Sequence, residues 1–247
     1  MVVLVACRQN NSSDLQENKE AKAMLQGVWI DEESGEESFH VKGDSIYFPD
    51  AISMPTSFRI CGDSLYLASG TAYGIVKQTE HVFWFKNLNG DLLKLQKGDA
   101  DTAMEHGSPS VLSYTHQVKI DSVVTYNNNR YHWYIAINPT KYKVTKRSFN
   151  DDGIEVENVY YDNIMNVSVF QGARKIYSSD FRKQQYSGMV PASFLDEAIF
   201  ANMTFSDIDA AGLHFHATLC IPDGATCYMV DCTISYTGDL SMKLVEY

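Results

Sequence analysis

The chain has 247 residues, of which 45% are hydrophobic and 12% are aromatic. This composition can bury sizeable cores, so we expect a globular protein with one large β domain or two smaller ones. Its 31 acidic and 20 basic residues give a formal net charge of -11. Because such a surface repels phosphate backbones, the composition argues against nucleic-acid binding.

Residues 1–22 predict a lipoprotein signal followed by a polar tether. The run Met1-Val-Val-Leu-Val-Ala-Cys7 is apolar, and its last four residues resemble a bacterial lipobox. The resemblance implies cleavage before Cys7 and attachment of a diacylglycerol to its thiol. Since only six residues precede Cys7 and none is basic, the pattern also requires a start codon further upstream. Residues 8–20 are polar and suit a spacer between the lipid and a folded domain.

Residues 23–97 predict an antiparallel β domain that contains a repeat. Ser38-Phe-His-Val-Lys-Gly-Asp-Ser-Ile-Tyr-Phe48 and Ser57-Phe-Arg-Ile-Cys-Gly-Asp-Ser-Leu-Tyr-Leu67 align without a gap, and a looser third copy spans residues 83–95. Each copy places Gly-Asp between two alternating apolar runs. This arrangement is typical of a β-hairpin.

The second copy contains Gly62-Asp-Ser-Leu65, which resembles the nucleophile block of a family of esterases. In that family, the serine lies between a strand and a helix, and its partner histidine follows an aspartate by three residues. Here the strand pattern continues after Ser64, and no histidine of the chain has an aspartate three residues before it. We therefore interpret Ser64 as a turn residue and not as a nucleophile.

The first domain opens with Leu25-Gln-Gly-Val-Trp29. A Gly-x-Trp motif at the head of a β meander is similar to the first strand of lipocalin-like barrels. At five to six residues a strand, residues 23–97 have room for about six or seven strands. We therefore expect a meander or a partial barrel, and we disfavour a large interior cavity.

Residues 98–112 are small, polar and aperiodic and predict a linker, after which residues 113–247 form a second domain. Alternating apolar patterns predict several strands there, beginning with a hairpin around Asn127-Asn-Asn129. One helix is predicted near Val190, because Pro191 suits a first helical turn. The chain is therefore expected to be mainly β, and its second domain an antiparallel sheet with one packed helix.

The second domain resembles an uncharacterised family of Bacteroides-type lipoproteins, a domain of unknown function. The features that carry the resemblance are Phe194-Leu195, the turn Cys220-Ile-Pro-Asp-Gly224 and the closing Ile234-Ser-Tyr-Thr-Gly-Asp-Leu240. The resemblance implies an envelope lipoprotein of a Gram-negative bacterium, and no activity comes with it. The acid-rich export tag of surface lipoproteins is missing after Cys7, so we expect an outer-membrane protein that faces the periplasm.

Two features near the C-terminus suggest sites. In a strand, His214, His216 and Cys220 point to one face and could ligate zinc, but the local sequence lacks a fourth ligand. We therefore expect two histidines on a half-buried strand face, and neither a metal nor a cofactor. Cys220 and Cys227 could form a disulfide if the hairpin between them has a two-residue register, and buried free thiols are the alternative.

The lipoprotein resemblance also suggests O-glycosylation. Bacteria of that type attach glycans to Ser or Thr that follows Asp and precedes an aliphatic residue. The chain has this pattern at Ser45, Ser64, Thr102 and Ser122. Thr102 is the preferred site because it lies in the linker, where a side chain is exposed.

Together these features favour a lipid-anchored envelope protein that binds a protein, peptide or carbohydrate and is not an enzyme. The alternative is an envelope hydrolase, for which His214, His216 and Asp231 are the residues to test first. A structural subunit of an outer-membrane assembly is the third interpretation. An exposed aromatic groove would favour binding, a pocket converging on histidines would favour the enzyme, and a flat apolar patch would favour assembly.

Overall fold

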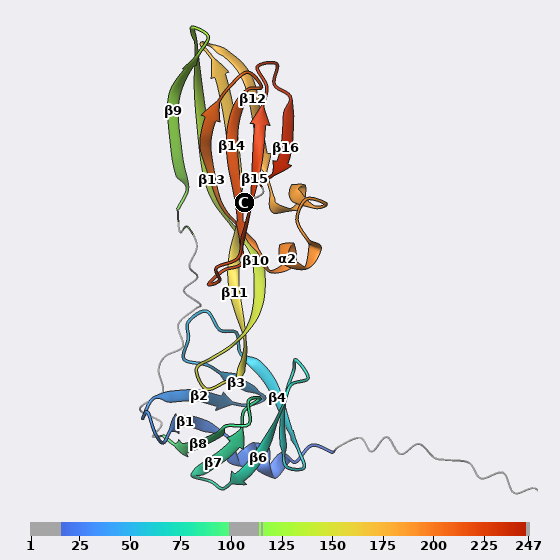
Figure 1. Ribbon diagram of the computed structural model, residues 1–247. Helices are drawn as coiled ribbons and strands as arrows, with labels where there is room; N and C mark the ends of the chain where they lie inside the picture. Colours follow the sequence, from blue (N-terminus) through green and yellow to red (C-terminus); the bar gives the residue numbers. More distant parts are fainter. Residues whose placement is uncertain (1–15, 99–113, 115, 246–247) are drawn as a thin grey trace, which may run out of the picture. The chain divides into compact units, whose positions relative to one another are not determined.

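The structure is a computed structural model that describes residues 16–98, 114 and 116–245 (Figure 1). The chain divides into two compact units. Of the described residues, the first unit contains 16–98 together with 149–156, and the second unit contains the others. The expected mainly β class is confirmed, because strands make up most of both units and the helices are short.

The first unit is a closed antiparallel barrel in which each strand pairs with its neighbour in sequence. The strands are β1 (Gly27–Asp31), β2 (Glu37–Lys42), β3 (Ser45–Tyr47), β4 (Thr56–Cys61), β5 (Ser64–Leu67), β6 (Ala72–Gln78), β7 (Val82–Lys86) and β8 (Leu92–Lys97). Closure occurs because residues 29–31 of β1 pair with residues 95–97 of β8. The meander is thus confirmed, but it closes fully with eight strands where six or seven were expected, since strands such as β3 are unusually short.

The Gly-Asp repeat forms hairpins, as predicted. In the second copy Cys61 pairs with Ser64, which leaves Gly62-Asp63 as a two-residue turn, and the first copy has the same geometry around Gly43. Gly62 has a φ of 56°. Asp63 does not have a positive φ. A positive φ at the first turn position alone is the feature of a type II′ hairpin, which favours glycine there. Ser64 follows this turn and begins β5.

Large side chains fill the interior of the barrel. Trp29 is fully buried, its Nε1 donates a hydrogen bond to the carbonyl oxygen of Leu25 at 2.7 Å, and its ring lies 5.7 Å from that of Phe83. The Nζ of Lys97 lies 5.5 Å from the indole centroid. The short helix α1 (Lys19–Met24) precedes β1 and packs on β4. The indole of the Gly-x-Trp motif is therefore a packing element of the barrel core.

The second unit contains two four-stranded antiparallel sheets, with strand orders β12-β11-β10-β9 and β13-β14-β15-β16 (Figure 1). The strands are β9 (Val118–Tyr126), β10 (Asn129–Phe149), β11 (Glu155–Gln171), β12 (Arg174–Phe181), β13 (Ile199–Ile208), β14 (Leu213–Cys220), β15 (Cys227–Ile234) and β16 (Leu240–Leu244). The sequence predicted a single sheet, because a strand pattern does not reveal which strands are neighbours. The predicted helix is present as α2 (Ala192–Glu197), preceded by the 3-10 turn η2 (Lys183–Tyr186). Among the described residues, no helix is long and apolar enough to cross a membrane.

The two sheets of the second unit enclose one core. Trp133 of β10 stacks on Phe205 of β13 with ring centroids 5.0 Å apart and meets Phe215 of β14 edge-on at 6.2 Å. Tyr131 and Tyr186 are buried in the same core. These aromatic side chains therefore fill the interior and do not form an exposed groove.

Two buried polar side chains connect β11 to the start of β13. Asp162 Oδ1 accepts hydrogen bonds from the main-chain N–H groups of Phe200 at 2.7 Å and of Asn163 at 2.9 Å. The Nδ2 of Asn163 donates to the carbonyl oxygen of Phe200 at 3.0 Å. Burial raises the pKa of Asp162, and these N–H groups oppose the increase. The pair bonds to both main-chain groups of Phe200 and so connects the two sheets at this point.

The first unit also includes residues 149–156, which form the tip between β10 and β11. Ile154 and Val156 belong to the barrel core. The N–H of Glu155 donates to the hydroxyl oxygen of Tyr73 at 2.8 Å. This packing does not follow from the sequence, because the apolar pattern of the tip is the same whichever core the tip belongs to.

Candidate functional site

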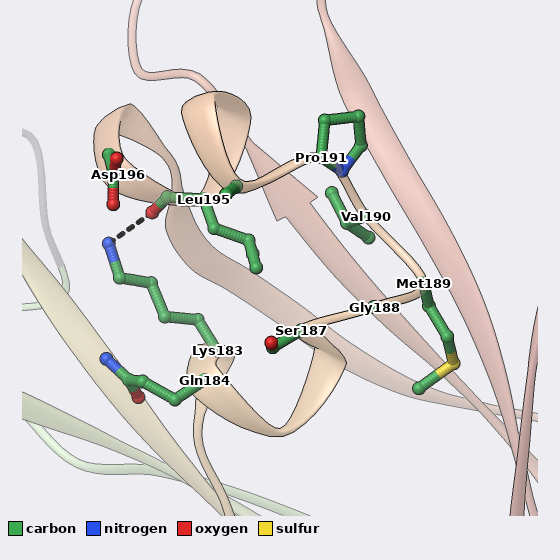
Figure 2. A pocket seen from close by; sticks show the side chains of 10 residues that line it. Lys183, Gln184, Ser187, Gly188, Met189, Val190, Pro191, Leu195 and Asp196 are labelled. Carbon is green, nitrogen blue, oxygen red and sulfur yellow. Dashed lines mark hydrogen bonds between the residues drawn. The ribbon is translucent and has the colours of Figure 1, made fainter.

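A pocket with a volume of about 860 Å³ opens beside α2. It is formed by η2, by α2 and by the segment between them. Figure 2 shows Val190 and Pro191 opposite Lys183 and Gln184, with Leu195 between the two sides. Apolar walls with a few polar groups are the usual lining of sites for small ligands.

Lys183 connects the two walls of this pocket. Its Nζ donates hydrogen bonds to the carbonyl oxygens of Leu195 and Ala198, both at 2.7 Å, and the first of these is drawn in Figure 2. Carbonyl groups at the C-terminal end of a helix favour a cation. Burial lowers the pKa of Lys183, while the negative charges of Asp162 and Asp196 raise it. Lys183 therefore caps α2 and places a positive charge in the pocket wall.

The pocket rests on the core of the second unit. Tyr186 is fully buried, and its ring meets Phe200 edge-on at 5.5 Å. Its carbonyl oxygen accepts hydrogen bonds from the N–H groups of Met189 and Val190, both at 3.1 Å. Burial and the neighbouring thiol of Cys232 raise the pKa of the Tyr186 hydroxyl. Because main-chain hydrogen bonds and core packing hold this segment, the pocket is formed before any ligand arrives.

The structure brings together the three residues that the sequence offered for a hydrolase. On the outer face of the second sheet, His216 pairs across strands with Asp231, and His214 pairs with Thr233. His214 Nδ1 lies 2.9 Å from Asp231 Oδ2, and His214 Nε2 lies 3.0 Å from Asp209 Oδ1. The hydroxyl of Thr233 donates to Asp231 Oδ2 at 2.9 Å. These side chains form one hydrogen-bonded group, which we call the His214 cluster.

The electrostatics of the His214 cluster favour a protonated imidazole. Burial lowers the pKa of His214, but its hydrogen bonds to Asp209 and Asp231 outweigh burial and raise that pKa above 6.5. The hydrogen bond between His214 and Asp209 also lowers the pKa of the Asp209 carboxyl group. Asp231 Oδ1 is buried and accepts no hydrogen bond within the described part of the chain, and His216 Nε2 is 3.9 Å away. An imidazolium held between two carboxylates has no lone pair for a substrate proton, so His214 is a poor general base in this state.

The zinc candidates do not form a ligand set. His214 and His216 share a strand face, as predicted, but the sulfur of Cys220 is bonded to Cys227 and is no thiolate. In residues 16–98, 114 and 116–245, no group of three or more His, Cys, Asp or Glu side chains could hold a metal ion. The two histidines therefore interact with nearby carboxylates and are not part of a set of zinc ligands.

Cys220 and Cys227 form a disulfide between β14 and β15. They are direct cross-strand partners, with Cα atoms 4.2 Å apart. The N–H of Ile221 donates to the carbonyl oxygen of Thr226 at 3.1 Å, so these two residues form a hydrogen-bonded pair. The adjacent cysteines therefore form a non-hydrogen-bonded pair, in which the Cα atoms lie closer together. Residues 221–226 connect the two strands, and the register is the one that a two-residue turn at Asp223-Gly224 would give, so the cysteines lie opposite each other.

The predicted modification sites are only partly within the described residues. Cys7 and Thr102 lie outside them. Ser45 and Ser64 begin β3 and β5 and are half-buried. Ser122 lies on β9 and is exposed, which makes it the most accessible of the described candidates.

Sequence reasoning missed a second histidine cluster, on the outer face of the first sheet. His132 Nε2 lies 2.8 Å from Asp121 Oδ2, and the hydroxyl of Tyr134 lies 2.8 Å from His132 Nδ1. The alternation of His132 and Tyr134 was readable as a strand face, but the approach of Asp121 depends on the register of β9 against β10. The α2 pocket was also missed. It depends on hydrogen bonds from Lys183 to the carbonyl oxygens of Leu195 and Ala198, which are not its neighbours in the sequence.

Comparison with known proteins identifies the family. No curated protein matches the chain. Residues 98–242 match the model of a family described as "Domain of unknown function (DUF4738)". The matched residues include the α2 pocket, the His214 cluster and the disulfide, and they amount to more than half of the chain. The chain therefore belongs to the DUF4738 family.

Proposed function

We propose that this chain is a lipid-anchored protein of the cell envelope that binds a ligand or partner protein and catalyses no reaction. The observation that carries the binding role is the preformed α2 pocket, with its apolar side chains opposite Lys183. The anchor rests on the resemblance of residues 4–7 to a lipobox, and the polar residues after Cys7 suit a tether. We place the protein on the outer membrane, facing the periplasm.

The lining of the pocket favours a peptide or another amphipathic ligand over a carbohydrate. Met189 offers apolar surface, the largely buried side chains of Val190 and Leu195 line the wall behind it, and Lys183 and Asp196 offer opposite charges. A carbohydrate site typically presents aromatic faces, and the pocket lining contains no aromatic side chain. A peptide segment supplies both an apolar side chain and polar main-chain groups, which matches this lining.

Site-specific photo-crosslinking in native envelopes tests the binding role. A photoreactive amino acid replaces Ala192, which lines the pocket and is exposed, and in a matched control it replaces Ala173, which is exposed in the turn before β12. We expect a discrete cross-linked product at Ala192 and none at Ala173. Equal products at both positions, or no product at either, would contradict a specific site beside α2.

The anchor is tested separately by the intact mass of the protein extracted from native membranes. Cleavage before Cys7 with the mass of a lipid added is the expected result. An unprocessed and unlipidated chain would remove the anchor and, with it, the envelope location. A further mass increment in sugar units would direct attention to Thr102 and Ser122.

A hydrolase is the second candidate, favoured by the approach of His214, His216 and Asp231. Its weakness is that both ring nitrogens of His214 already have carboxylate partners. Hydrolysis of ester and glycoside substrate panels by purified protein, compared with His214→Ala and His216→Ala variants, decides the matter. Turnover that either substitution abolishes would favour the enzyme over the binding protein.

A further inference from the structure

A surface rich in lysine lies on the outside of the barrel, across the neighbouring strands β6, β7 and β8. Lys77 of β6 pairs with Trp84 of β7, and Trp84 pairs with Lys94 of β8. Lys86 and Leu92 form the next pair on this side of β7 and β8. Directly opposed residues, and those two apart along a strand, point to the same side of a sheet. With Val76 added, they form the surface that we call the lysine–tryptophan face.

Two of these lysines lie over the indole ring. The Nζ atoms of Lys77 and Lys94 are 4.5 and 5.4 Å from the centroid of Trp84. The indole Nε1 donates a hydrogen bond to Glu32 Oε1 at 3.1 Å, which fixes the orientation of the ring. The cations are thus held beside an oriented aromatic group.

The lysines of this face form no ion pair in the described part of the chain, although the carboxylate of Glu32 lies at the edge of Trp84. The side chains of Lys77, Lys86 and Lys94 are exposed. The chain as a whole carries a formal net charge of -11, so this local group of cations runs against the overall charge. A local group of cations of this kind attracts an anionic partner even on an acidic chain.

Apolar side chains accompany the lysines. Val76 is 53% exposed and Leu92 is 42% exposed. The register of β6 against β7 shifts between Ile75 and Lys77, and this bulge leaves Val76 unpaired beside the lysine. Lysine, tryptophan and aliphatic side chains on one surface are the combination found at the boundary between lipid headgroups and acyl chains.

We propose that the lysine–tryptophan face docks the barrel on a membrane surface that carries anionic lipid headgroups. The lysines lie against the phosphate groups, and Trp84 and Leu92 enter the interfacial layer. This inference adds a second, non-covalent membrane contact to the proposed anchor and does not involve the α2 pocket. The membrane contact is tested with unlipidated protein. A negative result would therefore not contradict the proposed anchor, and the absence of an anchor would not contradict the membrane contact.

The test measures binding of the full chain to phosphatidylcholine vesicles with and without phosphatidylglycerol. The variant Lys77→Gln/Lys86→Gln/Lys94→Gln removes the cations of the face. The matched control, Lys119→Gln/Lys143→Gln/Lys175→Gln, removes the same charge from exposed positions of the second unit. Since each lysine near an anionic surface contributes about 1 kcal/mol, the first variant is expected to bind on the order of 100-fold more weakly, and the control to bind like the natural chain.

Trp84 supplies a second readout. Trp29 is 0% and Trp133 7% exposed, so a change of emission on binding reports Trp84. We expect emission to move to shorter wavelength with anionic vesicles, and the Trp84→Phe variant to lack this change. Equal binding to neutral vesicles, an equal loss in the control variant, or binding to a soluble polyanion without any emission change at vesicles would each overturn the proposal.

Discussion

Both units of this protein are built from eight antiparallel strands, and they enclose their cores in different ways. In the barrel, the strands are three to seven residues long, and one continuous ladder surrounds the core. In the second unit, the strands reach 21 residues, and the core lies between two separate sheets. The barrel has no sheet edge, whereas the second unit has four edge strands and needs contacts between its sheets. The number of strands therefore does not decide between a closed barrel and two separate sheets. A barrel closes only if its first strand pairs with its last strand.

Two glycines illustrate the difference. Gly62, in a barrel turn, has a φ of 56°, and a Cβ placed there would meet no atom within 4 Å. Gly212, just before β14, has a φ of 149°, and a Cβ placed there would lie 2.1 Å from the carbonyl oxygen of Ile234. The barrel turn needs glycine for its backbone conformation alone. The sheet pair β14–β15 needs glycine because two backbones approach too closely for a side chain.

The largest expected effect comes from the hairpin tip that belongs to the barrel. Ile154→Ala should lower the free energy of unfolding of the barrel by about 2 to 5 kcal/mol, because a fully buried side chain leaves a cavity. Hydrogen exchange resolved by peptide measures where protection is lost. We expect the loss in β1–β8, with Asp151→Ala, an exposed change on the same tip, as the control. Loss confined to the second unit would contradict the assignment of residues 149–156 to the barrel core.

The second effect separates the two glycines. Gly212→Ala should destabilise the second unit by about 3 kcal/mol, because a methyl group overlaps the backbone of β15. Gly62→Ala should destabilise the barrel by about 1 to 2 kcal/mol, which is the conformational term alone. Urea denaturation of both variants gives the comparison. Equal effects would mean that the close approach at Gly212 relaxes easily.

The disulfide gives the third effect. The double variant Cys220→Ser/Cys227→Ser should lower the stability of the second unit by about 2 to 3 kcal/mol, because an open chain gains conformational freedom when it unfolds. Thermal unfolding with and without a reductant measures it. The natural chain in reductant should approach the variant, and the variant itself should not respond. A natural chain that is insensitive to reductant would indicate that the disulfide contributes nothing.

The smallest effect is a pH dependence at the His214 cluster. Since the folded pKa of His214 is raised above the unfolded value of about 6.5, its contribution is present below pH 6.5 and is lost as pH rises through the folded pKa. The cluster is partly exposed, so we expect a change of about 1 kcal/mol or less. Denaturation across this range should show the decline in the natural chain and not in His214→Gln. His216→Gln is the control and should keep the decline, because Asp209 and Asp231 still hold His214.

Prediction from sequence succeeded where the information is local. The Gly62-Asp63 turn and the strand after it were predicted, because a two-residue turn is encoded by the residues within it. Ser64 was interpreted as a turn residue, whereas it is the first residue of β5. The shared face of His214 and His216 follows from strand alternation alone. Cys220 and Cys227 were named as a possible disulfide with buried free thiols as the alternative, because the sequence leaves open the register that sets them opposite each other. The closed barrel was missed, because the pairing of β1 with β8 joins distant parts of the chain.

The amino-acid sequence by itself determined the mainly β class, the hairpins, the acidic charge and the candidate residues, since composition and alternation act within a few positions. Tertiary structure decided that one set of strands closes into a barrel and the other divides into two sheets. It also decided that Ile154 enters the barrel core and that Lys183 reaches the end of α2. These contacts join residues far apart in the chain, and their free energy depends on burial and hydrogen bonds that exist only after the strands have found their partners.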